Sequence, residues 1–173
     1  MKFPIASILV FAAAASFAQQ GHGNQAPEAM KGLSFLVGNW AGKQNFNNPG
    51  SPLIADITIK AHAFAAGLFI EEELHTTLPG AKPTEVHHFI SFDPKTNEYH
   101  AWWFNDTSNT PSELTGTLTG NELVLLSHPT NPKAPVMRAT YDQVSDSAMN
   151  CKLEMKMGDS WQELFHNSYQ KKG

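Results

Sequence analysis

The sequence predicts an all-β protein: an antiparallel up-and-down barrel of about ten strands, preceded by a short N-terminal helix. From Gly38 onward, short apolar or alternating runs are separated at regular spacing by Gly, Pro, Asn and Asp, which is typical of strands joined by hairpins. The pairs Gly120-Asn121 and Gly158-Asp159 favour tight hairpin turns. Residues 149–157 alternate between apolar and polar side chains, so this strand has one buried face.

Residues 1–18 are typical of a secretory signal peptide. Lys2 supplies a positive charge, Phe3 to Ala15 form an uncharged apolar stretch, and Ser16-Phe17-Ala18 offers small residues for cleavage before Gln19. A membrane anchor is the alternative, but the apolar stretch is short for a full span. We therefore expect a periplasmic or secreted protein with no stable membrane anchor. Residues 19–26 are expected to be a flexible leader, and residues 27–173 one barrel domain.

Each element after the leader has its own signal. Pro27 can open a helix that runs to about Val37, with an inward apolar stripe formed by Met30, Leu33, Phe35 and Leu36. A loop at residues 93–97 and a Pro-rich loop at residues 129–135 interrupt the later strands. The strands are expected near residues 39–46, 53–61, 68–77, 84–92, 98–105, 113–119, 122–127, 136–144, 148–157 and 161–170.

Composition excludes several classes of function. The formal net charge is −4 and Arg138 is the single arginine, which argues against binding to nucleic acid. Cys151 is the single cysteine, so an internal disulfide is impossible. It shares a strand face with Met149 and Leu153, which favours a buried apolar residue over a reactive thiol.

The order of several motifs resembles the exported DUF1579 family, whose members are similar to calycin and lipocalin-like barrels and have no assigned function. The resemblance covers roughly residues 33–171. It is carried by Leu36-Val37-Gly38-Asn39-Trp40 after the helix, Gly67-Leu68-Phe69, Asp93-Pro94 followed by Tyr99-His100-Ala101-Trp102-Trp103, and Trp161-Gln162-Glu163 in a strand ending at Tyr169.

The resemblance implies structural roles for Gly38 and Trp40, with the indole closing one end of the barrel. Lipocalins pair this Trp with an Arg near the last strand. Here only Lys171 and Lys172 follow Tyr169, so a lysine makes this contact or the contact is absent. A more distant likeness, to ten-stranded haem-binding barrels of the nitrobindin type, implies haem as a cofactor and an axial histidine on a late strand, where His166 lies.

The adjacent His87 and His88 do not predict a metal site, because neighbours in a strand point to opposite faces. A hairpin around residues 93–97 places His88 opposite Trp103. His87 and His100 then share a face but lie about 13 Å apart along the strands. The chain also lacks His-x-x-x-His and Cys-x-x-Cys spacings.

The expected strand at residues 98–105 is rich in aromatic side chains on both faces. One face carries His100, Trp102 and Phe104, and the other carries Tyr99, Ala101 and Trp103. Two interpretations remain open. The aromatic residues form core and helix contacts, or Trp and His side chains line a ligand cavity.

Two carboxylates lie on apolar faces of expected strands. Glu72 shares a face with Ile70 and Leu74, where it could serve as an acid or base, but we expect an outer face with Glu72 at its wet edge. Strict alternation places Glu163 and Asn167 on one face with the aromatic residues of the last strand, where either could line a wet cavity. The sequence has neither a Gly-x-Ser-x-Gly motif nor a Gly-rich phosphate loop, so it identifies no catalytic set.

These observations favour an exported barrel that binds a small apolar or amphipathic molecule. One alternative is a structural barrel with a filled interior, whose outer face binds another exported protein through an apolar patch. Another is an enzyme acting on a hydrophobic small molecule through Glu72, Glu163 or a histidine, which requires a carboxylate and an imidazole within hydrogen-bond reach in one cavity. The candidate ligand-binding residues are His88, His100, Trp102, Trp103, Tyr141, Met155 and His166.

Overall fold

The structure, a computed structural model, describes residues 26–51, 53–106 and 108–173. The predicted signal peptide and all but the last residue of the leader lie outside these ranges. In chain order the elements are η1 (Glu28–Leu36), β1 (Gly38–Phe46), β2 (Leu53–Phe64), η2 (Ala65–Gly67), β3 (Phe69–Thr77), β4 (Thr84–Asp93), β5 (Glu98–Asn105), β6 (Ser112–Thr119), β7 (Glu122–Ser127), β8 (Met137–Ser145), β9 (Ala148–Met157) and β10 (Ser160–Lys171).

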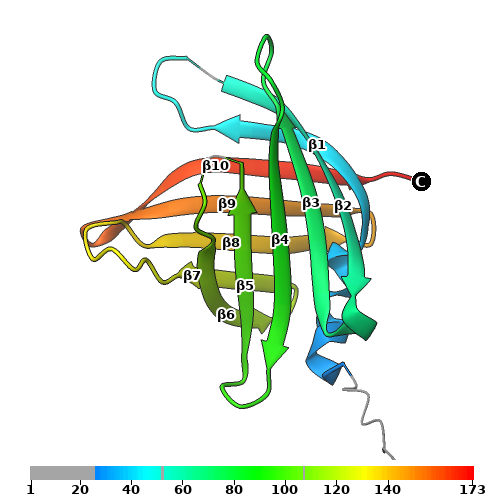
Figure 1. Ribbon diagram of the computed structural model, residues 1–173. Helices are drawn as coiled ribbons and strands as arrows, with labels where there is room; N and C mark the ends of the chain where they lie inside the picture. The colour runs from blue at the N-terminus through cyan, green and yellow to red at the C-terminus, as the bar shows by residue number, and fades with distance from the viewer. Residues whose placement is uncertain (1–25, 52, 107) are drawn as a thin grey trace, which may run out of the picture.

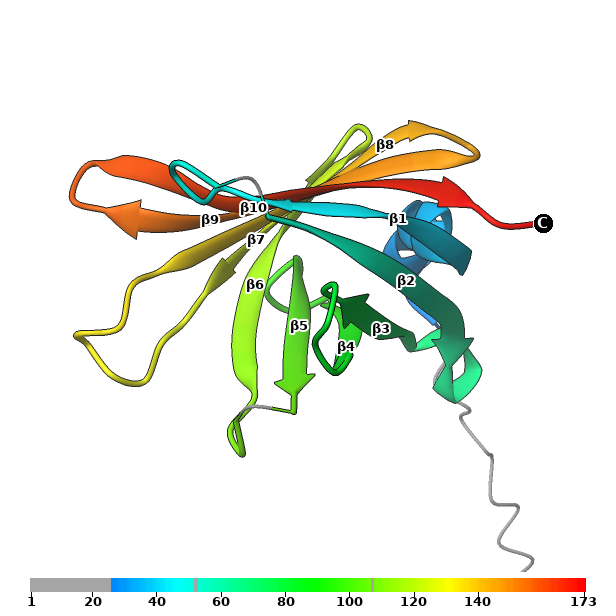
Figure 2. The same cartoon turned by 90° about the horizontal axis from the view of Figure 1, so that it is seen from above.

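The ten strands form one closed antiparallel barrel (Figure 1). Every strand pairs with its neighbour in the chain, and β1 pairs with β10 to complete the ring. Seen from above, β1 and β8 to β10 form one wall, and β3 to β6 form the opposite wall (Figure 2). The predicted all-β up-and-down barrel is confirmed. The largest difference at a strand end is in β2, which continues to Phe64 rather than ending at Ala61.

Alternation along the strands separates an inner face from an outer one. On β2, Ala55, Ile57, Ile59 and Ala61 are buried, and the residues between them are exposed. On β5 the face with Tyr99, Ala101 and Trp103 points inward, since Ala101 pairs with the buried Ile90 and Leu114. His100 and Trp102 therefore lie on the outer face.

The short helix η1 covers one end of the barrel. It is a 3₁₀ helix that begins after Pro27, and its buried residues are the four of the predicted stripe: Met30, Leu33, Phe35 and Leu36. The Tyr99 hydroxyl donates a hydrogen bond of 2.8 Å to the carbonyl oxygen of Ala29, which ties the helix to β5. Among the helices in the described ranges, none is long and apolar enough to cross a membrane.

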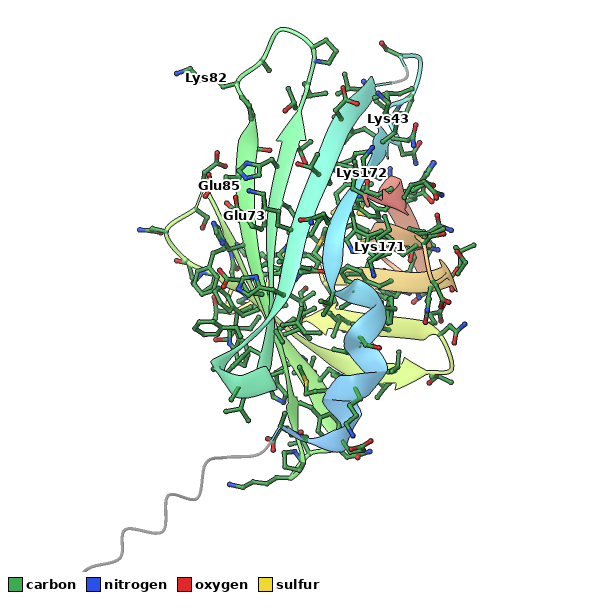
Figure 3. The ribbon with its side chains drawn as sticks, turned by 90° about the vertical axis from the view of Figure 1, so that its right-hand side faces the viewer. Lys43, Glu73, Lys82, Glu85, Lys171 and Lys172 are labelled. Atoms are coloured by element: carbon green, nitrogen blue, oxygen red, sulfur yellow. The ribbon has the colours of Figure 1, made fainter. Side chains whose placement is uncertain are left out.

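Trp40 lies between η1 and the interior of the barrel. Its side chain is 2 % exposed, and its indole Nε1 donates a hydrogen bond of 2.8 Å to the carbonyl oxygen of Leu36. Lys171 Nζ lies 5.1 Å from the ring centroid, within cation–π range. Lys171 is drawn close to the junction of η1 and β1 in Figure 3. Of the two possibilities left open by the sequence, the structure shows the lysine contact.

Gly38 is required where η1 passes into β1. Its φ of +137° is rarely adopted by residues with a side chain, and a Cβ added there would lie 2.5 Å from Lys171 Cε. A larger residue would therefore displace the cation that covers Trp40.

A β-bulge reverses the alternation of β10. Glu163 pairs with Glu154, but Phe165 pairs with Leu153, so one extra residue lies between them. Asn167 consequently points inward and is 3 % exposed, whereas Glu163 lies on the outer face. The expectation that Glu163 and Asn167 share one face is wrong, because strict alternation does not continue through a bulge.

Replacing Trp40 by Ala should lower the free energy of unfolding by about 3–5 kcal/mol, since it removes a buried aromatic residue and its hydrogen bond. Urea denaturation of both proteins measures the difference. Phe104→Ala is a suitable control, because Phe104 lies on the outer face of β5 and is 44 % exposed. A loss for Trp40→Ala no larger than that of the control would show that Trp40 does not close the barrel.

Candidate functional site

The interior of the barrel contains a cavity of about 400 Å³ in the half remote from η1. Its walls come from β1 to β6 and β8 to β10, and the loop between β3 and β4 reaches its mouth. Lys82 projects from this loop, at the end of the barrel opposite η1 (Figure 3). The lining residues are Gln44, Phe46, Ile57, Leu74, Thr76, Leu78, Lys82, Thr84, Val86, His88, Trp103, Asn105, Ser112, Tyr141, Cys151, Leu153, Phe165, Asn167 and Tyr169.

A carboxylate and an imidazole form a buried pair beside this cavity. Glu72 on β3 is 0 % exposed, and its Oε2 lies 3.1 Å from His88 Nδ1 on β4. The two residues face each other in the β3–β4 register, and both side chains point inward. Tyr141 on β8 crosses the interior and brings its hydroxyl oxygen to 3.3 Å from the same ring nitrogen.

One face of the His88 imidazole is also in contact with an aromatic ring. It stacks on the indole of Trp103, with ring centroids 4.6 Å apart and planes 19° from parallel. His88 and Trp103 are directly opposite each other on β4 and β5, as the hairpin register predicts. The ring is thus fixed by a stacking partner and by two polar partners.

A second polar group lies on β9 and β10. Asn167 Nδ2 donates a hydrogen bond of 2.7 Å to the Tyr169 hydroxyl, and Asn167 pairs with Cys151 across the two strands. Burial raises the pKa of the Cys151 thiol, and the nearby Glu72 carboxylate adds to the effect. Burial likewise raises the pKa of the Tyr141 and Tyr169 hydroxyls well above their usual value.

Several buried polar atoms have no hydrogen-bond partner among the described residues: Glu72 Oε1, Trp103 Nε1, Asn167 Oδ1 and, on the outer face, His100 Nε2. Buried polar atoms in folded proteins are nearly always paired. Trp103 and Asn167 line the cavity, so a ligand with both acceptor and donor groups could meet these two side chains.

A second cavity, of about 510 Å³, lies beside the first. It is formed largely by residues 110–114 and by the loop after β7, including His128, Pro129 and Pro135. Trp103 and Ser112 line both cavities. Trp103 therefore stands where the two spaces meet.

The structure brings together only some of the residues that the sequence suggested for ligand binding. His88, Trp103 and Tyr141 line the interior cavity. Met155 lies on the same strand face as Leu153, two residues further along β9, but it does not line the cavity. The other three residues, His100, Trp102 and His166, lie on the outer surface of the barrel.

The outer surface gives His100 and Trp102 a different environment. Trp102 lies 6.3 Å from Phe69 and 6.1 Å from His100 between ring centroids. Further ring contacts link Phe69 to Phe64 and Phe64 to Phe89, which in turn contacts Phe104. These six side chains form an outer aromatic cluster across β2 to β5.

His166 does not lie where the haem interpretation requires an axial histidine. His166 is half exposed on the outer face, and its Nδ1 lies 2.7 Å from Glu163 Oε1. His100 also faces outward, so neither can reach a group inside the barrel. In the described ranges, no group of three or more His, Cys, Asp or Glu side chains could hold a metal ion.

The expectation that Glu72 lies at the wet edge of an outer face is wrong. Glu72 pairs with Ala61 on one side and His88 on the other, and both partners belong to the inner face. The signal in the sequence was that Ile70 and Leu74, two residues before and after Glu72, share its strand face. It marks a shared face without saying which side of the sheet is the core.

Sequence reasoning also missed Gln44, a buried polar residue of β1 that lines the cavity. Its Oε1 accepts a hydrogen bond of 3.2 Å from the Thr76 hydroxyl. The signal that could have found it is its position four residues after Trp40, on the same strand face.

Cys151 should react slowly with iodoacetamide in the folded protein, because the raised pKa of its thiol leaves little thiolate. At pH 8 we expect alkylation at least about a hundredfold slower than in guanidinium, where the thiol is exposed and unperturbed. Mass spectrometry of timed samples measures both rates. Equal rates in the two states would contradict the burial of this thiol.

Stability should fall as the pH rises above about 10, the value at which an exposed tyrosine ionises. Burial raises the pKa of Tyr141 and Tyr169, so the folded state retains protons that the unfolded state releases. Each residue then removes about 1.4 kcal/mol per pH unit above that point. Urea unfolding between about pH 9 and 11.5 measures the slope, and Tyr141→Phe should make it shallower. A slope unchanged by this substitution would contradict the shifted pKa of Tyr141.

Solved structures share the fold of this chain. A comparison with curated proteins finds no match. The crystal structure of Rv2717c from M. tuberculosis aligns with a TM-score of 0.65 at 17 % identity, over 86 % of this chain and 100 % of that one. The S-type phycobiliprotein lyase CPES from Guillardia theta aligns with a TM-score of 0.57 at 8 % identity, over 87 % and 95 % of the two chains. The family described as "Protein of unknown function (DUF1579)" matches residues 26–171, and the chain belongs to this family.

Proposed function

We propose that this protein is an exported barrel that binds one small amphipathic molecule in its interior cavity. The observation that carries the proposal is a cavity with apolar walls and a polar floor. Ile57, Leu74, Val86 and Phe165 supply apolar wall surface, and His88 lies at the floor. A volume of about 400 Å³ falls within the range of small-molecule sites, roughly 300–1,000 Å³.

Charge at the mouth favours one orientation of the ligand. Lys82 is exposed on the loop between β3 and β4 and is one of the residues that line the cavity. An anionic group would be stabilised there, in contact with water, while an apolar body occupied the interior. The ligand class is therefore an amphipathic anion, with polar atoms at its inner end that meet Trp103 Nε1 and Asn167 Oδ1.

The fold neighbours are compatible with this proposal but do not name a ligand. One of them is called a phycobiliprotein lyase, so a barrel of this shape can act on another molecule. At 8 % identity, none of its chemistry transfers to this chain. Export rests on the signal-like residues 1–18 alone.

The structural-barrel alternative makes two predictions, and the observations argue against one and support the other. It requires a filled interior, and the cavity argues against that. It also requires an apolar patch outside, and the outer aromatic cluster is one, with Phe64 46 % and Phe104 44 % exposed. The cavity carries more weight, because an open interior contradicts a requirement of this alternative, whereas an outer apolar patch is compatible with ligand binding inside the barrel.

Binding can be tested with 1-anilinonaphthalene-8-sulfonate, an aromatic anion that fluoresces in apolar surroundings. We expect one molecule to bind per chain, and Val86→Trp to weaken binding at least about tenfold by filling the cavity, a loss of about 1.4 kcal/mol. Val144→Trp is the matched control, since Val144 is 57 % exposed and lies outside the cavity.

The melting temperature of each variant should be compared, so that loss of fold is distinguished from loss of space. If wild type, Val86→Trp and Val144→Trp bind the dye equally, the dye is bound on the outer surface. The interior would then not be a binding site for an amphipathic anion.

A further inference from the structure

The pairing of Glu72 with His88 has a geometry that ligand binding alone does not require. A catalytic use of this pair rests on the proposed function, because a substrate must first enter the cavity. When Glu72 is ionised its oxygens only accept hydrogen bonds, and in that state the imidazole supplies the N–H in the 3.1 Å contact between Nδ1 and Oε2. The proton of the neutral ring is then on Nδ1. Nε2 is left as the basic nitrogen of a side chain that lines the cavity.

The surroundings hold the ring in position. Trp103 stacks on one face, and the Tyr141 hydroxyl lies 3.3 Å from Nδ1. These contacts come from β5 and β8, while Glu72 and His88 come from β3 and β4. A base fixed by its neighbours loses little entropy when it meets a bound substrate, which is an advantage in catalysis.

The other titratable groups near the pair remain protonated at neutral pH. Tyr141, Tyr169 and Cys151 face the Glu72 side of the interior from β8, β10 and β9, and burial raises the pKa of each of them. Cys151 is therefore unsuited to be a nucleophile. With a thiol nucleophile excluded, this set of side chains is suited to proton transfer by the imidazole of His88.

We propose that His88 is a catalytic base that moves a proton within an amphipathic carbon acid bound in the cavity, with Glu72 as its positioning residue. Nε2 removes a proton from a carbon that lies between a carbonyl group and a carbon–carbon double bond, and the C–H electron pair enters the conjugated enolate that results. The imidazolium returns the same proton to a different carbon, so the double bond shifts and the base is regenerated. The step consumes no other reactant and releases none.

A generic carbon acid, 5-nitrobenzisoxazole, tests this base without knowledge of the natural substrate. When a base removes the C3 proton, the C–H electron pair forms the third bond of a nitrile and the N–O bond breaks. The product is a coloured phenolate. The initial rate of absorbance increase is measured against protein concentration and pH. Competition with 1-anilinonaphthalene-8-sulfonate shows whether the probe occupies the cavity.

We expect His88→Phe to lower the rate about a hundredfold, a typical contribution of a general base. His87→Phe is the matched control, because His87 is adjacent in the chain but contacts Glu85 on the outer face. The rate of the His87→Phe variant should equal that of wild type. Glu72→Gln should lower the rate and move the inflection of the rate–pH profile to lower pH, since an amide stabilises the imidazolium less than a carboxylate does. A purely structural role for Glu72 would leave that inflection in place.

Each outcome decides a separate point. Equal rates for wild type, His87→Phe and His88→Phe would overturn the catalytic base, even where dye binding confirms the cavity as a binding site. An unmoved inflection in Glu72→Gln would overturn the role of Glu72. If the dye and the probe both fail to enter the cavity, the proposed binding function itself fails. If His88→Phe does not fold, His88→Gln, which keeps a polar side chain, provides the same comparison.

Discussion

The pairing of β1 with β10 is the constraint on which the rest of the structure depends. Trp40 to Phe46 pair with residues 165–171, and this contact turns ten consecutive strands into a closed ring. Closure removes the two free sheet edges and gives every strand one inner and one outer face. It also brings Lys171 over Trp40, so that η1 can close one end of the ring.

Closure makes a buried polar interior possible. Taking a carboxylate out of water is unfavourable unless it is paired and hydrogen-bonded. Glu72 is fully buried and pairs with His88 on the neighbouring strand, and Tyr141 reaches the same imidazole from the other side of the barrel. An open sheet would not hold the three side chains together. The interior therefore combines an apolar shell, which stabilises the barrel, with a small polar centre, which is the basis of both proposals.

The positions of the strands could be predicted from sequence because alternation and turn residues are local signals. The inward direction could not be predicted on β5, since Trp102 and Trp103 make both faces aromatic. Glu72 was placed on the wrong side for the same reason: a shared face does not identify the core. The β10 bulge has no local marker, so Glu163 and Asn167 were expected on one face, whereas of these two residues only Asn167 points inward. The convergence of Glu72 with residues of β4 and β8 depends on the long-range closure of the ring.

Native mass spectrometry of the processed protein, purified from its own exported compartment, tests most directly the claim that the interior holds a small molecule. We predict a chain beginning at Gln19 that carries a stoichiometric adduct, small enough for a cavity of about 400 Å³ and released on denaturation. A bare mass from protein that also fails to bind added amphipathic anions would contradict this claim. The protein would then be better described as a closed structural barrel that binds another protein through the outer aromatic cluster.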